Sequence, residues 1–192
     1  MKELWTEKYR PKSLSDYFID KQQLDKVKLW IKNFIDEDED MKPFLVLYGS
    51  TGIGKTTLAH LIFKKYNFEV IECNASDSRS KKSLNEIIGT TSKYSICTNE
   101  DSKKQIFKKV GIIMDEIDGL CGGEIGGVQE LIKITIEKNR KNNKNNYVCP
   151  VICTSNSIKE KKLLPILKNA VVIHIQKPSS IECNKLIKNI YT

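Results

Sequence analysis

The residues in this sequence that can do chemistry start with a phosphate-binding pattern, Gly49–Thr57. The pattern G-x-x-x-x-G-K-[ST] is informative when a buried strand enters it and a helix leaves it. Here the apolar run Phe44–Tyr48 precedes the pattern and the helical pattern Leu58–Tyr66 follows it. Backbone N–H groups of such a loop converge on phosphate oxygens at a helix N-terminus, so we expect a bound nucleoside triphosphate. Lys55 would reach the β- and γ-phosphates, and the Thr56 hydroxyl would hold Mg²⁺.

The alternative interpretation is an ordinary glycine-rich turn between a strand and a helix. The strand and helix patterns on either side favour the nucleotide site. The predicted cofactor contacts in the loop are Gly49, Ser50, Thr51, Gly52, Ile53, Gly54, Lys55, Thr56 and Thr57.

Two acids follow a later apolar run, Val110–Met114. In a phosphate-loop fold, the first carboxylate after such a strand can hold Mg²⁺, and the next can orient or deprotonate the attacking water. We assign Asp115 to the metal and Glu116 to the water. Asn156 ends another apolar run, where its amide can bond both the γ-phosphate and the attacking water. The alternatives are surface acids at a strand end and a turn-forming asparagine.

Strands that alternate with helices must position these residues. This order predicts an α/β fold in which a five-stranded parallel sheet is covered by helices on both faces, with the ligand at the carboxyl ends of the strands. The expected strands are Phe44–Tyr48, Phe68–Cys73, Val110–Met114, Pro150–Thr154 and Val171–Ile175. The expected helices start near Lys21, Leu58, Lys81, Val128, Lys161 and Ile181.

The remaining segments are expected to lack regular structure. Leu4–Leu14 is polar, aromatic and stopped by proline, which favours an extended arm. Gly89–Lys104 is expected to be a surface excursion, and Lys138–Asn146 a loop rich in lysine and asparagine. We expect residues 1–177 to form one core, with residues 1–20 as its arm, and residues 178–192 to supply the first helix of a lid.

Composition limits the class of protein. The 192 residues carry a net charge of +8, and only three of the 32 basic residues are arginine. Such an excess favours a polyanionic partner, although codon bias can also enrich lysine. The six cysteines form no C-x-x-C pair, so zinc and a disulfide framework are not expected. Because no apolar run has the length of a membrane span, we expect an intracellular protein without a membrane partner.

Together the motifs resemble those of AAA+ clamp loaders, most closely the large subunits of replication factor C. The resemblance runs from Trp5 to about Lys177, and its N-terminal arm and Asn-Ala-Ser-Asp turn are more restrictive than the phosphate loop. The segments that carry it are Trp5–Pro11, Gly49–Thr57, Asn74–Ser80, Ile113–Gly119, Gly126–Leu131 and Ile152–Asn156.

The resemblance implies roles for further residues. Tyr9, Arg10 and Pro11 would line the adenine pocket, and Asn156 would distinguish ATP from ADP. The DNA-binding residues would be Arg79, Lys81 and Lys82, which would contact phosphates without reading sequence. The implied cofactors are ATP and Mg²⁺, and the implied partners are clamp-loader small subunits, a sliding clamp and primer-template DNA.

The sequence also departs from this family. Small subunits of the family carry a Ser-Arg-Cys before the fifth strand, and its arginine reaches into the ATP site of the neighbouring subunit. The corresponding segment here, Ile166–Val171, has no arginine. This chain would therefore supply no arginine to a neighbour, while it would need one from a neighbour itself. We expect the rest of the family's lid and its collar to be missing from this chain. Tyr94–Cys97 offers only one aromatic for clamp docking.

Our leading hypothesis is the ATPase core of a clamp-loader large subunit, located in the nucleus by resemblance or at a viral replication site. The alternatives are a nucleotide-gated scaffold with little hydrolysis and, more weakly, a small-molecule phosphotransferase.

Overall fold

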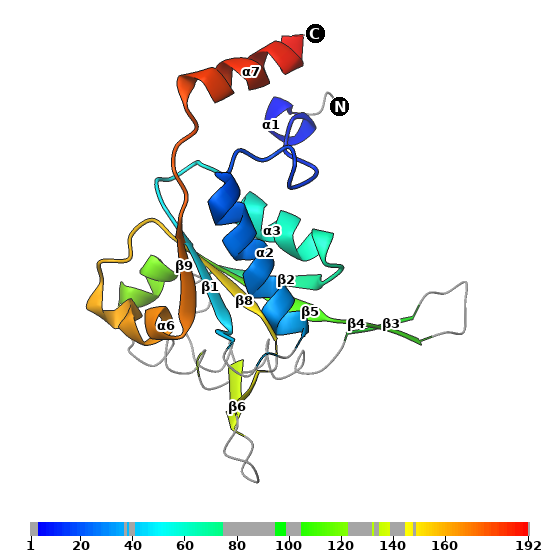
Figure 1. Cartoon of the computed structure of the whole chain (residues 1–192), viewed down its shortest axis with the longest axis vertical. Helices are drawn as coiled ribbons and strands as arrows, with labels where there is room; N and C mark the ends of the chain where they lie inside the picture. The colour runs from blue at the N-terminus through cyan, green and yellow to red at the C-terminus, as the bar shows by residue number, and fades with distance from the viewer. Residues whose placement is uncertain are drawn as a thin grey trace.

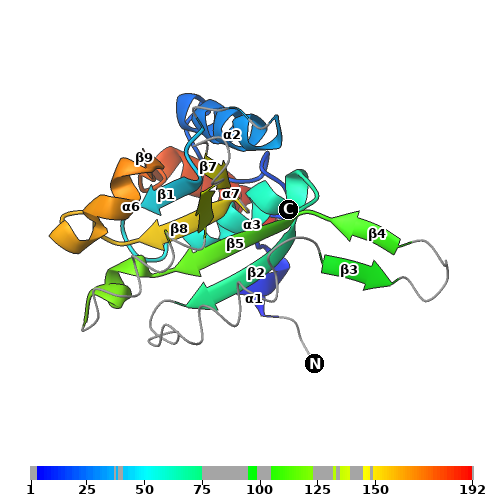
Figure 2. The same cartoon turned by 90° about the horizontal axis from the view of Figure 1, so that it is seen from below.

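The computed structural model describes residues 4–36, 38, 41–74, 95–98, 105–122, 132, 135–138, 145–147 and 149–191. Its centre is a five-stranded sheet in the order β2-β5-β8-β1-β9, and every neighbouring pair is parallel. Figure 2 shows the arrows of β2, β5, β8 and β1 pointing the same way. The predicted five-stranded parallel sheet is therefore confirmed. Its strands are β1 (Phe44–Tyr48), β2 (Glu69–Asn74), β5 (Val110–Asp115), β8 (Val151–Ser155) and β9 (Ala170–His174).

Helices cover both faces of the sheet (Figure 1). The structure assigns α1 (Trp5–Lys8), α2 (Lys21–Ile35), α3 (Lys55–Lys65), α6 (Leu164–Lys168) and α7 (Ser180–Tyr191), and the 3₁₀ helices η1 (Ile117–Gly122) and η2 (Lys161–Leu163). The start of α2 follows from its cap, because the Asp20 carboxylate accepts the N–H groups of Gln22 and Gln23. Within the described residues, no helix is both long and apolar enough to cross a membrane.

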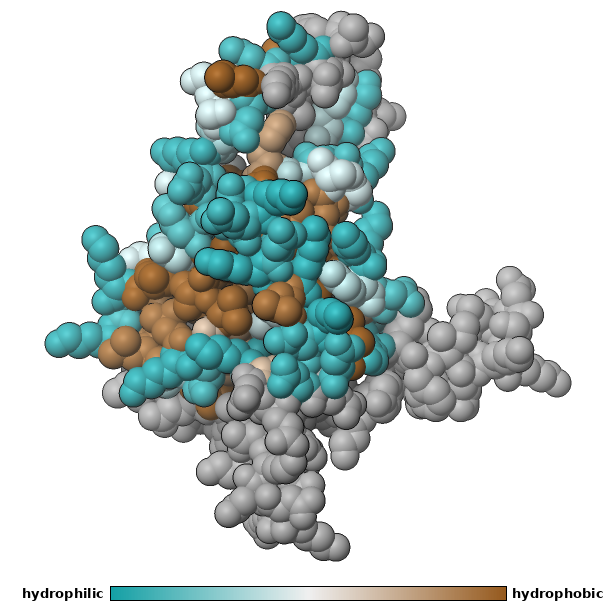
Figure 3. Space-filling model, viewed as in Figure 1, coloured by the Kyte–Doolittle hydropathy of each residue, from teal (hydrophilic) through white to brown (hydrophobic). Residues whose placement is uncertain are grey.

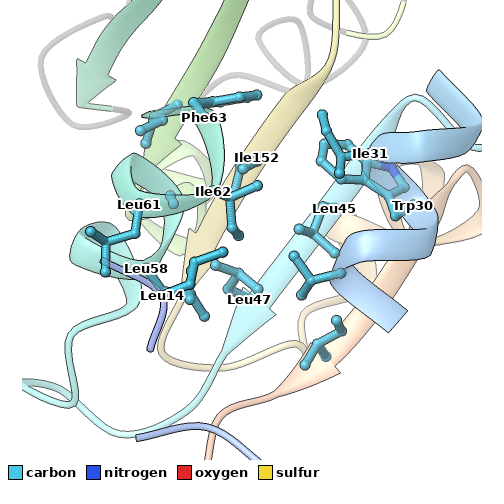
Figure 4. Packing of buried hydrophobic residues seen from close by; sticks show 14 of the residues in the cluster. Leu14, Trp30, Ile31, Leu45, Leu47, Leu58, Leu61, Ile62, Phe63 and Ile152 are labelled. Carbon is cyan, nitrogen blue, oxygen red and sulfur yellow. The ribbon is translucent and has the colours of Figure 1, made fainter. Parts of the chain in front are cut away.

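The sheet divides the hydrophobic core into two layers, as expected when both faces of parallel strands are buried. Phe44 and Val46 point into one layer, which η1, η2 and α6 cover, and Leu45 and Leu47 point into the other. Figure 4 shows the second layer, where side chains of α2 and α3 pack on β1 and β8. The labelled residues there are Leu14, Trp30, Ile31, Leu45, Leu47, Leu58, Leu61, Ile62, Phe63 and Ile152. This packing fixes α3, and with it the loop that precedes α3, relative to the strand ends.

Hydrophobic side chains also reach the surface on one side of the molecule. Figure 3 shows a hydrophobic area where Figure 1 places α6 and β9, the edge strand of the sheet. Leu164 of α6 and Val172 of β9 are exposed hydrophobic residues.

The prediction of an extended N-terminal arm is wrong at its start, because Trp5–Lys8 forms one helical turn. The turn closes with the Tyr9 N–H donating to the Trp5 carbonyl at 3.0 Å. It cannot continue, since the residue before Pro11 is disfavoured in the helical region.

Two segments expected to be irregular contain antiparallel strands. β3 (Ser95–Thr98) lies in the predicted surface excursion and pairs with β4 (Gln105–Lys108). β6 (Ile136–Lys138) pairs with β7 (Asn145–Tyr147), so both ends of the predicted lysine- and asparagine-rich loop are strands. Pairing satisfies the backbone groups of a chain that leaves the core and returns, whatever its side chains.

Other predicted elements lie outside the described residues. They are the helix from Lys81, nearly all of the helix from Val128 and the DNA-contact residues Arg79, Lys81 and Lys82.

Gly111 in β5 provides a test of the packing between the sheet and α3. A Cβ atom at this position would lie 2.5 Å from Cε1 of the fully buried Phe63. We expect Gly111→Ala to lower the free energy of unfolding by about 1–3 kcal/mol, since overpacking a dense core forces side chains out of place. Urea denaturation of the full chain measures the change.

The matched control is the same substitution in a Phe63→Leu background, which removes the ring that the new Cβ atom would meet. There the cost of Gly111→Ala should be smaller. An equal cost in both backgrounds would show that Phe63 is not the constraint.

Candidate nucleotide-binding site

The loop between β1 and α3 exposes the first-turn N–H groups of α3. Its last residue, Gly54, caps the helix with φ +86°, a left-handed conformation that glycine adopts without strain. Glycine has no side chain to bond these N–H groups, so they remain available for an anion at the positive end of the helix dipole. The loop therefore has the local geometry of a phosphate site.

Lys55 lies at the centre of this site and is nearly buried, with 9% of its surface exposed. Its Nζ donates to the carbonyl oxygens of Gly49 and Ser50, both at 3.0 Å, and to Oδ1 of Asn156 at 2.9 Å. All three acceptors are neutral. Burial lowers the pKa of Lys55, and the nearby carboxylates of Asp118, Asp115 and Glu116 oppose this shift. A cation held by neutral oxygens in a partly desolvated position is suited to attract phosphate.

Thr56 and Asp115 meet beside Lys55. The Thr56 hydroxyl donates to Oδ1 of Asp115 at 2.7 Å, which links the first turn of α3 to the end of β5. Both groups supply hard oxygen atoms, the ligands that Mg²⁺ prefers when it binds a protein through one or two side chains and keeps several waters. The donor set therefore fits Mg²⁺ next to bound phosphates.

Glu116 follows Asp115 and is exposed, with a backbone φ of +55°. A positive φ is uncommon for a residue other than glycine and is often found at functional sites. The Glu116 carbonyl accepts the Gly119 N–H at 2.8 Å, and its own N–H donates to the Thr154 hydroxyl at 3.0 Å. Both backbone polar groups of Glu116, its N–H and its carbonyl, are thus hydrogen-bonded.

Asn156 is oriented by contacts on both ends of its amide. Oδ1 accepts from Lys55 and, at 3.3 Å, from the Thr51 hydroxyl. Nδ2 and the backbone N–H donate to the Asp118 carboxylate at 3.3 and 3.4 Å. The amide therefore connects the phosphate loop with the acidic segment after β5.

Two adjoining cavities surround these residues. One of about 320 Å³ is lined by loop residues together with Arg10, Asp115, Glu116 and Asn156. The other, of about 480 Å³, is lined by Tyr9, Arg10 and Pro11 of the N-terminal segment and by Gly52, Ile53, Gly54 and Thr57. The structure therefore brings the described candidate residues to one site, with the N-terminal segment beside the loop.

Sequence reasoning overlooked three residues of this site. Thr154 is buried at the end of β8, and a polar residue in that apolar strand was the available signal. Asp118 lies in the segment Ile113–Gly119, but the motif does not indicate its bond to Asn156. Tyr17 donates its hydroxyl proton to the Ile53 carbonyl at 2.8 Å, and no local pattern indicates this. Burial raises the pKa of Tyr17 to about 12.

Comparison with solved structures identifies the same fold elsewhere. The Holliday junction branch migration motor RuvB of Thermotoga maritima superposes with a TM-score of 0.62, at 18% identity, over 94% of this chain and 53% of that chain. A RuvB variant, P216G, gives a TM-score of 0.66 over 94% of this chain and 54% of its own. At this identity the likeness concerns the fold alone.

Curated relatives are more similar in sequence. The replication factor C large subunit of Methanococcus vannielii is 41% identical over 172 residues, which are 89% of this chain and 31% of the relative. Replication factor C subunit 1 of Schizosaccharomyces pombe is 32% identical over 204 residues, 98% of this chain and 21% of the relative. The chain thus spans a third or less of the length of these relatives.

The family comparison covers most of the chain. The sequence pattern of the "ATPase family associated with various cellular activities (AAA)" matches residues 45–179, from β1 to the segment before α7. This range contains the phosphate loop, the acidic end of β5 and Asn156, which the fold brings together. The chain belongs to the AAA family of ATPases.

Proposed function

We propose that this chain is the ATP-binding and ATP-hydrolysing core of a clamp-loader large subunit, which helps to load a sliding clamp onto primed DNA. The observation that carries the proposal is the hydrogen-bonded group at the sheet edge, in which Lys55 contacts Asn156 and Thr56 contacts Asp115. Membership of the AAA family and the similarity to replication factor C large subunits support it.

The two cavities suit the two ends of ATP. The triphosphate would occupy the smaller one, where the N–H groups of the phosphate loop and Lys55 offer positive charge. The adenine would occupy the larger one against Tyr9, Arg10 and Pro11. Tyr17 would help to keep the loop beside this cavity through its bond to Ile53.

The Thr56 hydroxyl and the Asp115 carboxylate would hold Mg²⁺. When bound, Mg²⁺ neutralises charge that develops on the phosphate oxygens. Glu116 would orient or deprotonate the attacking water, and this exposed residue lines the triphosphate cavity. Asn156 would bond the γ-phosphate and that water, with Asp118 fixing its amide.

The assembly around this core follows from the family resemblance. By the same resemblance, we propose that a neighbouring small subunit supplies the arginine that activates hydrolysis in this site. Because Ile166–Val171 lacks an arginine, this chain would supply none to a neighbour. Arg79, Lys81 and Lys82 are proposed to contact DNA phosphates, and α7 is proposed to start the lid. Nuclear localisation stays a prediction.

The first test is ATP turnover by the full chain, alone and with clamp-loader small subunits, sliding clamp and primed DNA from the same source. We expect stimulation by these partners. Lys55→Ala should abolish the stimulated turnover and weaken ATP binding by about 10- to 100-fold, because a bond between charged groups is lost.

Lys64→Ala is the matched control, since Lys64 is exposed on the same helix. It should leave binding and turnover unchanged. ATP binding without stimulation would instead favour a nucleotide-gated scaffold.

Glu116→Gln tests the assignment of the base. This variant should keep ATP affinity but lower turnover in the reconstituted complex by about 10²- to 10⁴-fold, since general-base catalysis is lost. Glu160→Gln changes an exposed acid and should have no effect. A Glu116→Gln variant with wild-type turnover would remove Glu116 from the catalytic role.

Asp115→Asn tests the proposed Mg²⁺ site. Titration calorimetry would measure ATP affinity with and without Mg²⁺. The gain in affinity that Mg²⁺ gives should be at least about tenfold smaller in this variant than in the wild type, a loss of about 1.4 kcal/mol. Binding in EDTA should not weaken, because the amide keeps the shape of the side chain. Asp25→Asn, a change at an exposed acid, is the control, and equal Mg²⁺ dependence in all three proteins would exclude Asp115 as a ligand.

A further inference from the structure

Thr154 stands out as a polar residue at the buried end of an apolar strand. It is 1% exposed and belongs to β8, the central strand of the sheet. A buried hydroxyl needs partners, because an unpaired polar group in the interior is destabilising. Its two partners are Asp115, the proposed Mg²⁺ ligand, and Glu116, the proposed base.

The first partner is Asp115. The Thr154 hydroxyl donates to Oδ1 of Asp115 at 2.5 Å, and the Thr56 hydroxyl donates to the same oxygen at 2.7 Å. The terminal torsion of an aspartate is otherwise broad, so two donors from separate elements restrict how its carboxylate can turn.

The second partner is the backbone of Glu116. Its N–H donates to the Thr154 oxygen at 3.0 Å, while its φ is +55°. A glutamate with a positive φ persists only where the surrounding structure holds its backbone in that conformation. One hydroxyl thus accepts from the backbone of one acid while it donates to the side chain of the other.

The sheet register explains why Thr154 can do this. Met114 pairs with Cys153, and Asp115 and Thr154 are the next residues of the two strands, at the end of β5 and one residue before the end of β8. On the other side, Thr154 pairs with Leu47 of β1, close to the start of the phosphate loop. Thr154 therefore lies between the acidic end of β5 and the end of β1, from which the phosphate loop leaves.

We propose that Thr154 is a positioning residue for hydrolysis, which fixes the Asp115 carboxylate and the Glu116 backbone relative to each other. This inference rests on the proposed function. Thr154 lies in the wall of the smaller cavity with only 1% of its surface exposed, and its hydroxyl is already bonded to the two acids. It would therefore act through these acids, so its loss should impair turnover and Mg²⁺ dependence more than nucleotide binding.

The test compares Thr154→Val with Thr154→Ser in the full chain, reconstituted with its partners. Valine keeps the shape of threonine but lacks the hydroxyl, whereas serine keeps the hydroxyl. Thr154→Val should lower kcat by about 10- to 100-fold, as small misplacements of catalytic groups do, with KM for ATP little changed. Thr154→Ser should retain most of the wild-type turnover.

Two further readouts separate positioning from a loss of stability. Hydrogen exchange at the Glu116 amide, measured by NMR on the isolated chain, should be faster in Thr154→Val than in Thr154→Ser. The gain in affinity that Mg²⁺ gives a non-hydrolysable ATP analogue should be smaller in Thr154→Val, while affinity in EDTA stays unchanged. Thermal unfolding of both variants identifies any general destabilisation.

The outcomes distinguish the two proposals. Wild-type kcat in Thr154→Val, or equal losses in the valine and serine variants, would overturn the role of Thr154. A wild-type complex without turnover would overturn the proposed function. In that case amide exchange and Mg²⁺-dependent affinity would still decide the role of Thr154, and equal values in the two variants would overturn it.

Discussion

The site depends on the pairing of β8 between β1 and β5. Parallel strands bring their carboxyl ends to the same edge, and the register sets Thr154 and Ser155 beside the last residues of β1. The phosphate loop leaves β1 and the acids leave β5, so β8 is the element that joins them. Its end supplies Thr154 to the acids and Asn156 to Lys55. Without this order, the phosphate loop, the acids after β5 and Asn156 would not meet.

The packing on both sheet faces makes this arrangement rigid enough for chemistry. The layer under α2 and α3 contains fully buried side chains from three of the central strands. Gly111 lets Phe63 of α3 approach β5 closely, which sets the distance between the helix bearing Thr56 and the strand bearing Asp115. The same burial affects Lys55 at the carboxyl ends of the strands. Burial lowers the pKa of Lys55, and the carboxylates of Asp118, Asp115 and Glu116 oppose this shift.

The sequence predicted the elements of the core well, because their signals are local. Phe44–Tyr48 is apolar throughout and forms β1 with the expected bounds, and α2 begins where Asp20 can cap it. Predictions failed where local composition does not decide the backbone conformation. Trp5–Lys8 forms a helical turn although a proline follows shortly after, and the lysine- and asparagine-rich segment begins and ends in paired strands. These strands pair through their backbone groups, which every residue type carries, so side-chain composition does not reveal the pairing.

By itself, the sequence determined the phosphate loop, the acids after β5 and the strand that ends at Asn156, because each is a short motif whose chemistry lies in neighbouring residues. Only the tertiary structure decided which further side chains complete the site. Tyr17 lies 36 residues before Ile53, and Thr154 lies 39 residues after Asp115, yet each bonds its partner directly. The physical reason is that hydrogen bonds depend on distances in space, and the order and register of the strands set those distances.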